Sequence, residues 1–266
     1  MRCSMHPDYS IDAMCNEIDI TFDFRTDTPP GKDPDTFSDT LRRYHKLLWS
    51  KPLPSGVEFS LEFTRPSAPF YLEWSDAREV VLSSDAVVAS FTRTASTRRT
   101  EKKIAAAISK MPVDELNAFN TLGYTIGGMM VWPANKENGQ MTINGMRGFH
   151  PRIKDRFDLT VECIRRYYDD PSKQENEYNP LGKTFGRYSY FFKLFGDFRG
   201  FMDFFLLQDL VTEDYSAVRF HTPFEEFKTY PFPESVKLYR EYKQNASDFI
   251  RARNNRILAS ICNSCL

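Results

Sequence analysis

The chain contains 266 residues, and its 35 lysines and arginines nearly balance its 36 aspartates and glutamates, which gives a formal net charge of −1. This balance excludes a surface dedicated throughout to nucleic acid or anionic membrane, but it leaves room for a local basic patch. Hydrophobic residues make up 41% of the chain, so its length suffices for one large core or two closely joined lobes. The first ten residues contain no apolar run of the kind that a signal peptide needs, and we expect a cytoplasmic protein.

The first third of the chain shows the alternation of strands, interrupted by one helix. Apolar and polar residues alternate over 18–25 and again over 57–64, which predicts two half-buried strands. Between them, Asp35 or Thr36 is placed to cap a helix. That helix is predicted to bury Phe37, Leu41, Tyr44 and Leu48. Further strands are predicted at 69–74, 79–82 and 86–92, and this spacing is typical of an antiparallel meander.

The middle of the chain begins with a local excess of positive charge, formed by Arg93, Arg98, Arg99, Lys102 and Lys103 and opposed by Glu101. Contact with nucleic acid is one interpretation, and a solvated loop is the other. Charge runs of this length more often form solvated loops. Helices are then predicted around 101–110 and from Pro112 onward. Two apolar runs between residues 124 and 143 flank Asn138-Gly139, which predicts a hairpin.

The apolar period changes from two to about 3.6 near residue 149. Beyond that point the pattern predicts helices, which is the order of an α+β fold. We expect a mostly antiparallel sheet from the N-terminal half, packed against a C-terminal helical layer. The expected parts are a poorly ordered segment 1–17, a sheet-rich part 18–148, a helical part 149–260 that packs with it as one unit, and a tail 261–266.

The segment FFKLFGDFRGFMDFFLLQDLV, residues 191–211, is rich in phenylalanine but does not have the composition of a membrane span. A spanning helix needs about 20 residues with few or no charges, and this segment carries five charged residues. Most of its apolar residues fall on one stripe at helical spacing, which predicts a core helix. We expect Gly196 to end one helix and Asp197 to cap the next.

The strongest candidate for a binding site is MTINGMRGFHPRIKDR, residues 141–156. Pro151 is predicted at the first position of a helix, whose free N–H groups attract anions. Cations and polar side chains that gather at this place are Asn144, Arg147, His150 and Arg152, with Arg156 one turn further on. We therefore expect a phosphate-bearing ligand, such as a nucleotide or a nucleic-acid end. The alternative is an ordinary turn whose arginines pair with nearby acids.

Three charged residues lie on or beside apolar positions of predicted helices: Arg156, Asp209 and Arg253. A buried charge persists when it is paired, because an isolated one costs several kcal/mol. These residues are predicted to form a structural ion cluster or to line a cleft, and the sequence does not choose between the two.

Four of the five cysteines lie near the chain ends: Cys3, Cys15, Cys262 and Cys265. The CNSC spacing is half of a zinc site, so a site is conceivable where the termini meet. Free reduced thiols are the interpretation that we favour, and we predict no metal site and name no cofactor. The histidines and cysteines follow no recognisable catalytic order, so the sequence assigns no catalytic residue.

Five stretches together resemble a bacterial family of uncharacterised proteins, a domain of unknown function. They are LWSKPLPSG, GYTIGGMMVWPANK, TINGMRGF, DRFDLTVECIRRYY and DFRGFMDFFLLQDLV, and the resemblance spans about residues 18–258. It implies a bacterial, intracellular protein that forms a single unit, and it brings no assigned catalytic or binding residue. Two classes of function therefore stay open at this point: an enzyme or binding protein for a phosphate-bearing ligand, and a non-enzymatic interaction protein. The sequence does not predict an oligomeric state.

Overall fold

The computed structural model describes residues 17–56, 58–59, 61–63, 72–75, 79–88, 99–174 and 177–263. Several expectations fall outside these ranges. They are the order of nearly all of segment 1–17, the placement of Cys3, Cys15 and Cys265, and most of the basic stretch, from Arg93 to Arg98.

Residues 18–25 form consecutive turns and not the predicted strand. The cause is local, since aspartate side chains bind nearby backbone N–H groups and compete with strand pairing. The carboxylate of Asp19 accepts hydrogen bonds from the N–H and hydroxyl of Thr21, and Asp23 accepts from the N–H of Arg25. Ile18 and Phe24 are nevertheless buried, so the apolar half of the pattern still marks the core.

The predicted first helix is present as two pieces, α2 (Pro34–Phe37) and α3 (Asp39–Trp49). Ser38 separates them and caps α3, because its hydroxyl accepts a hydrogen bond from the N–H of Leu41. Helix α3 buries Leu41, Tyr44 and Leu48 as predicted. Phe37 is 42% exposed, because α2 ends there before the buried face of α3 begins.

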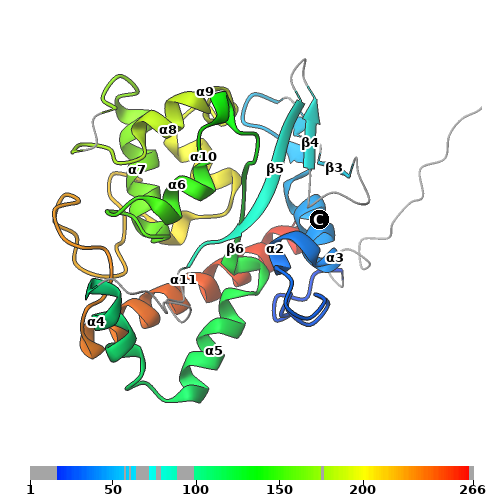
Figure 1. Ribbon diagram of the computed structural model, residues 1–266. Coiled ribbons are helices and arrows are strands. Elements are labelled where there is room, and N and C mark those ends of the chain that lie inside the picture. The colour runs from blue at the N-terminus through cyan, green and yellow to red at the C-terminus, as the bar shows by residue number, and fades with distance from the viewer. Residues whose placement is uncertain are drawn as a thin grey trace, which may run out of the picture.

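The strands are antiparallel, as the spacing predicts. β1 (Lys51–Pro52) pairs with β2 (Glu58–Phe59). A four-stranded sheet has the order β3-β4-β5-β6, with bounds Glu62–Phe63, Leu72–Ser75, Glu79–Ala86 and Met129–Pro133. β5 is the longest strand of this sheet; it covers the strand expected at 79–82 and continues to Ala86 (Figure 1). Of the strand expected at 86–92, residues 87–88 form a bend and residues 89–92 lie outside the described residues.

The hairpin predicted between residues 124 and 143 does not form. Its first half is a short helix η1 (Ile126–Gly128) followed by β6, which pairs with β5. A second short helix, η2 (Glu137–Gly139), follows, and the expected second strand is replaced by α6 (Ile143–Phe149). Thr142 starts α6, since its hydroxyl accepts a hydrogen bond from the N–H of Gly145 at 3.1 Å.

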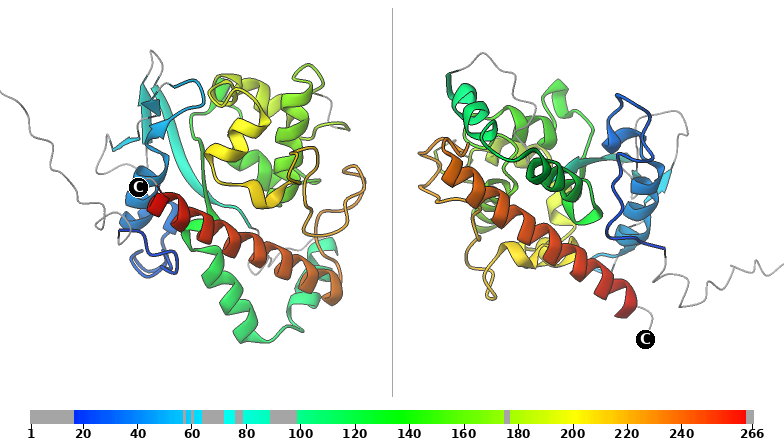
Figure 2. Two further views of the ribbon diagram at one scale, coloured as in Figure 1. Left: turned by 180° about the vertical axis from the view of Figure 1, so that it is seen from behind. Right: turned by 90° about the horizontal axis from the view of Figure 1, so that it is seen from below.

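The remaining elements are helical: α4 (Arg99–Ile108), α5 (Val113–Gly123), α7 (Phe157–Asp169), α8 (Gly182–Arg187), α9 (Ser189–Lys193), α10 (Phe198–Phe204), η3 (Gln208–Leu210) and α11 (Val236–Asn263). Figure 1 shows α6 to α10 grouped on one side of β5 and β6, with α2 and α3 on the other side. The views in Figure 2 show α11 running past α4 and α5 along the edge of the molecule. The architecture is the α+β fold that the change of apolar period predicts.

The phenylalanine-rich segment forms the densest part of the core. Gly196 has a φ of +77°, and the carboxylate of Asp197 accepts a hydrogen bond from the N–H of Gly200, so the predicted break and cap are confirmed. Rings from the two sides of this break meet: the ring centroids of Phe195, which follows α9, and Phe201 of α10 lie 5.2 Å apart. Among the described residues, no helix is both long and apolar enough to cross a membrane.

Candidate functional site

Arg147, the central residue of the predicted anion site, is enclosed in the core with no exposed surface. Its guanidinium donates to the Asp85 carboxylate at 2.5 Å and to the Thr160 hydroxyl at 3.1 Å. It also lies 5.5 Å from the ring centroids of Trp132 and Phe157. Arg147 therefore links α6 to β5 and α7 through its charged side chain, which lies between two aromatic rings. Because this side chain has no exposed surface, a ligand in solution does not reach it.

The helix predicted to start at Pro151 is absent, because residues 151–155 form turns and α7 starts at Phe157. Lys154 and Asp155 adopt positive φ values of 47° and 60°, and the N–H of Asp155 donates to the Arg147 carbonyl. Asn144, His150 and Arg152 are half-buried around this turn, and the N–H of Arg152 donates to Nδ1 of His150. The predicted anion site depended on free N–H groups at a helix start at Pro151. Since no helix starts there, these groups are not available.

The three charged residues expected on apolar positions do not form one cluster. Arg253 is fully buried and donates to the backbone carbonyls of Gly127, Met129 and Phe205. Burial lowers the pKa of Arg253 to about 9, while Asp209 opposes that shift. Asp209 itself makes a two-bonded ion pair with Arg256. Arg156 belongs to a separate network.

Arg156 fastens a long loop, residues 211–235, which we call the strap, to the start of α7. Its guanidinium makes two hydrogen bonds with the buried Asp158 carboxylate. It also donates to the Thr222 hydroxyl at 2.7 Å and to the Pro231 carbonyl at 2.9 Å. A buried arginine whose donors are shared between a carboxylate and two strap acceptors fixes the strap to the helix.

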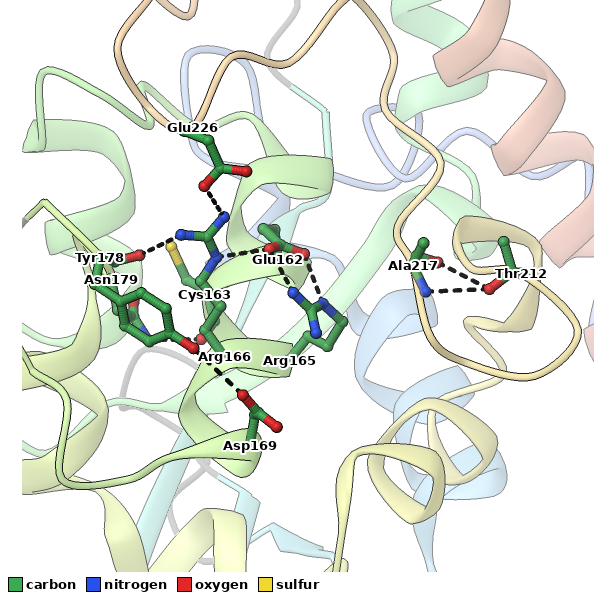
Figure 3. A network of polar contacts seen from close by, with 10 residues as sticks. All are labelled: Glu162, Cys163, Arg165, Arg166, Asp169, Tyr178, Asn179, Thr212, Ala217 and Glu226. Carbon is green, nitrogen blue, oxygen red and sulfur yellow. Dashed lines mark hydrogen bonds and ion pairs between the residues drawn. The ribbon is translucent and has the colours of Figure 1, made fainter.

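A second network fastens the strap further along α7 (Figure 3). The guanidinium of Arg166 donates to Glu162 at 2.6 Å, to the Tyr178 carbonyl at 2.8 Å and to Glu226 of the strap at 2.5 Å. Glu226 and Phe227 have positive φ values of 53° and 57°, a conformation that costs free energy and persists only where the surroundings hold it. The strap is thus held at Thr222, Glu226 and Pro231 by two arginines, one in α7 and one at its N-cap.

His221 lies on the strap directly before Thr222, one of the residues that Arg156 holds, and is 2% exposed. Its backbone N–H donates to the Asp158 carboxylate at 2.9 Å, and its ring Nδ1 lies 3.6 Å from the other carboxylate oxygen. The imidazole contacts the rings of Tyr242 and Phe249, with centroid distances of 5.6 and 6.3 Å. Within the described part of the chain, neither ring nitrogen of His221 has a hydrogen-bond partner.

The protonation states follow from this arrangement. Burial alone would raise the pKa of Asp158, but the Arg156 guanidinium, His221 and their hydrogen bonds hold it below its usual value. Burial lowers the pKa of His221, and Asp158 only partly opposes the shift. At neutral pH the pair is therefore a carboxylate facing a neutral imidazole.

His221 lines a cavity of about 330 Å³ between the strap, η3 and α11. This volume is at the lower end of the range of small-molecule sites. The other lining residues are Asp209, Leu210, Arg219, Phe220, Asn245, Asp248, Phe249 and Ala252. A neutral imidazole with Nδ1 near a carboxylate, in a residue that lines a cavity, has the composition of a general-base pair.

Sequence reasoning missed Asp158 and found no motif around His221. The two residues are 63 positions apart, so their contact leaves no local spacing pattern. The sequence carries one signal for this pair: His221 stands close to two phenylalanines in RFHTPF. Asp158 falls on the polar side of the predicted helix and gives none. No group of three or more histidines, cysteines, aspartates or glutamates in the described ranges is placed to hold a metal ion.

The chain belongs to DUF6994, a family of unknown function, whose model matches residues 18–257. A comparison with curated proteins found no match, and a comparison with solved structures found none either.

Proposed function

We propose that this protein is an enzyme that binds a small anionic ligand in the His221 cavity and uses the Asp158–His221 pair to transfer a proton. The observation that carries the proposal is the buried imidazole of His221, a lining residue of the cavity, whose ring faces a carboxylate and has no hydrogen-bond partner in the described chain. Buried polar atoms are nearly always hydrogen-bonded, so such an exception calls for an explanation. A ligand or a reactive water in the cavity supplies one.

The position of Asp158 favours one tautomer of His221. Because Nδ1 faces the carboxylate, its proton is stabilised there, and the lone pair is left on Nε2. Nε2 is then the atom that accepts a proton from the ligand or from an attacking water. The imidazolium that forms is stabilised by the Asp158 carboxylate, which Arg156 keeps ionised.

The charges at the cavity favour an anionic ligand. The two carboxylates of the cavity wall are both in ion pairs, Asp209 with Arg256 and Asp248 with Arg251. Arg219 is exposed at the wall, and its side chain makes no ion pair with a described residue. Arg219 can therefore hold a phosphate or carboxylate, together with the second N–H of the Asn245 amide, whose nitrogen also donates to the His221 carbonyl. A phosphate-bearing ligand, expected from the sequence at residues 144–152, is here proposed at the His221 cavity.

The proposal is tested by a thermal-shift screen of sugar phosphates, nucleotides and small carboxylic acids. A ligand present at 100 times its Kd stabilises the folded state by about 2.7 kcal/mol. For any ligand found, we expect weaker binding in Arg219→Gln and a loss of turnover in His221→Gln. Lys228→Gln, an exposed change on the same strap, is the matched control and keeps both.

A parallel variant, Arg152→Gln, separates the two candidate places for the ligand. Binding that is lost in Arg152→Gln and kept in Arg219→Gln would move the site to the turn at 144–152. Proton transfer is tested separately by the pH profile of turnover, which loses its lower limb in His221→Gln. An unchanged profile would remove His221 from the mechanism.

A further inference from the structure

A second hollow, which we call the Lys51 groove, lies between β1 with the residues that follow it and the start of α10. Its volume is about 520 Å³, and it shares no lining residue with the His221 cavity. It is lined by Lys51, Pro52, Leu53, Pro54, Asp197, Arg199, Gly200, Asp203 and Phe204. The inference drawn from it does not rest on the proposed function.

The ammonium group of Lys51 has an unusual environment for a lysine at a surface groove. It donates to the backbone carbonyl of Phe204 at 2.7 Å. It lies 4.6 Å from the centroid of the Phe204 ring and 5.1 Å from that of Trp49. No aspartate or glutamate of the described chain forms an ion pair with it.

This environment favours the neutral amine. Burial lowers the pKa of Lys51 to about 8, and the buried Arg253 charge adds to the shift. At pH 7 a lysine with this pKa is neutral about one time in ten, against roughly one in 3,000 for an unperturbed lysine. Desolvation beside apolar groups and a neighbouring cation is how nucleophilic lysines are activated.

The groove also contains groups suited to an anionic substituent. Arg199 is exposed, stacks on the Tyr215 ring at 4.3 Å and makes no ion pair with a described residue. Asp203 is occupied by the Tyr215 hydroxyl and by the Gln208 amide. Asp197 is occupied by the N–H of Gly200, which it caps. Arg199 is therefore the cation of this groove that is free to hold an anion.

We propose that Lys51 is a nucleophile that forms an imine with aldehydes or ketones carrying an anionic group, which Arg199 holds. The neutral amine attacks the carbonyl carbon, a C–N bond forms, and the π electrons of C=O move to oxygen. Transfer of the nitrogen proton to that oxygen gives a neutral carbinolamine. Its hydroxyl takes up a proton from water and leaves as H2O, which breaks the C–O bond and gives the protonated imine. No oxidant or reductant takes part.

The test uses pyridoxal 5′-phosphate as an aldehyde probe that bears a phosphate. Wild-type protein at pH 7 is incubated with less than one equivalent of probe and reduced with borohydride, and the modified residue is mapped by mass spectrometry. We expect a single addition at Lys51. The rate of labelling should rise with pH to a midpoint near 8, the pKa of the amine. Labelling spread evenly over exposed lysines would overturn the proposal, and this result needs no variant to fold.

Variants sharpen the assignment. Lys51→Arg keeps the positive charge but forms no imine, so the absorbance of the imine should disappear. Lys193→Arg, an exposed substitution on α9, is the control and should leave this absorbance unchanged. Arg199→Gln should weaken the reaction with pyridoxal phosphate about ten-fold and leave that with pyridoxal unchanged. Equal loss for both probes would overturn the role of Arg199, and imine formation that persists in Lys51→Arg would overturn the role of Lys51.

Discussion

The indole Nε1 of Trp49 donates a hydrogen bond to Nδ1 of His45 at 2.9 Å, and this contact fixes the direction of a buried proton chain. An indole N–H only donates, so Nδ1 is the acceptor and the proton of neutral His45 lies on Nε2. Burial lowers the pKa of His45 to about 3, so the ring is neutral. Nε2 donates to the hydroxyl of Ser84 at 3.0 Å, and that hydroxyl is left to donate to the carboxyl of Asp35.

We expect the stability of the protein to depend on pH through Asp35 and Asp85. Burial, the charge of Asp85 and that of Asp33 raise the pKa of Asp35, while Ser84 and Arg147 oppose the shift. Burial raises the pKa of Asp85 to about 7 against the attraction of Arg147. Both folded-state pKa values exceed the unfolded ones, so the folded state binds more protons above about pH 4. The stability from this pair is complete at low pH and is lost as the pH rises through 7.

Asp35→Asn imitates the protonated carboxyl and should flatten this dependence. The variant should gain stability relative to wild type, and the gain should grow as the pH rises from 5 to 8. The measurement is urea unfolding of both proteins at each pH, because the histidine contributions cancel in the difference. Asp39→Asn, an exposed carboxylate on α3, is the control. A difference between wild type and Asp35→Asn that does not change with pH would contradict the assignment.

Gly128→Ala should destabilise the protein strongly. A Cβ at this position would lie 2.2 Å from the carbonyl oxygen of Gly123, a backbone atom that cannot rotate away. We expect a cost of about 2–4 kcal/mol, measured by thermal or urea unfolding. Gly145→Ala is the matched control, since its Cβ would meet the nearest atom, the Thr142 hydroxyl, at 3.5 Å. Equal stability of the two variants would show that the chain at 123–128 relaxes without cost.

The spacing of apolar residues predicted the elements that have a continuous apolar face. It failed where the hydrogen bonds of a single side chain determine the backbone conformation. The buried face of α3 and the break at Gly196 follow from spacing and capping rules. Residues 18–25 alternate like a strand, but Asp19 and Asp23 bind nearby N–H groups and bend the chain. The hydroxyl of Thr142 likewise starts a helix where apolar spacing favoured a strand.

The candidate site was less accessible to sequence reasoning than the fold. The crowding of polar residues at 144–152 is real in the sequence, but the side chain of Arg147 is directed to Asp85, 62 positions away. His221 and Asp158 are brought together by a strap whose course depends on Arg156 and Arg166. Contacts between residues about 60 positions apart in the sequence do not change the local spacing of apolar residues. The sequence pattern therefore does not reveal them.

Replacement of Arg147 tests whether this residue is structural. Arg147→Ala would leave the Asp85 carboxylate, whose side chain is 19% exposed, without its cation and open a void between Trp132 and Phe157. We expect a loss of about 3–5 kcal/mol in the free energy of unfolding. Arg251→Ala removes an exposed arginine and should change stability by no more than about 0.5 kcal/mol. A melting temperature of Arg147→Ala equal to that of wild type would restore Arg147 as a candidate ligand residue.

Two arginines three positions apart on α11 should differ sharply in their contribution to stability. Arg253→Met keeps much of the side-chain volume but removes every donor, so the carbonyls of Gly127, Met129 and Phe205 are left buried without this partner. A buried polar group without a partner costs about 1–3 kcal/mol, so we expect a loss of roughly 3 kcal/mol or more. Arg256→Met removes a partly exposed ion pair with Asp209 and should cost less than about 1 kcal/mol. Urea unfolding of both variants measures the difference in their free energies of unfolding. If Arg253→Met loses as little stability as Arg256→Met, the three carbonyls have found other hydrogen-bond donors.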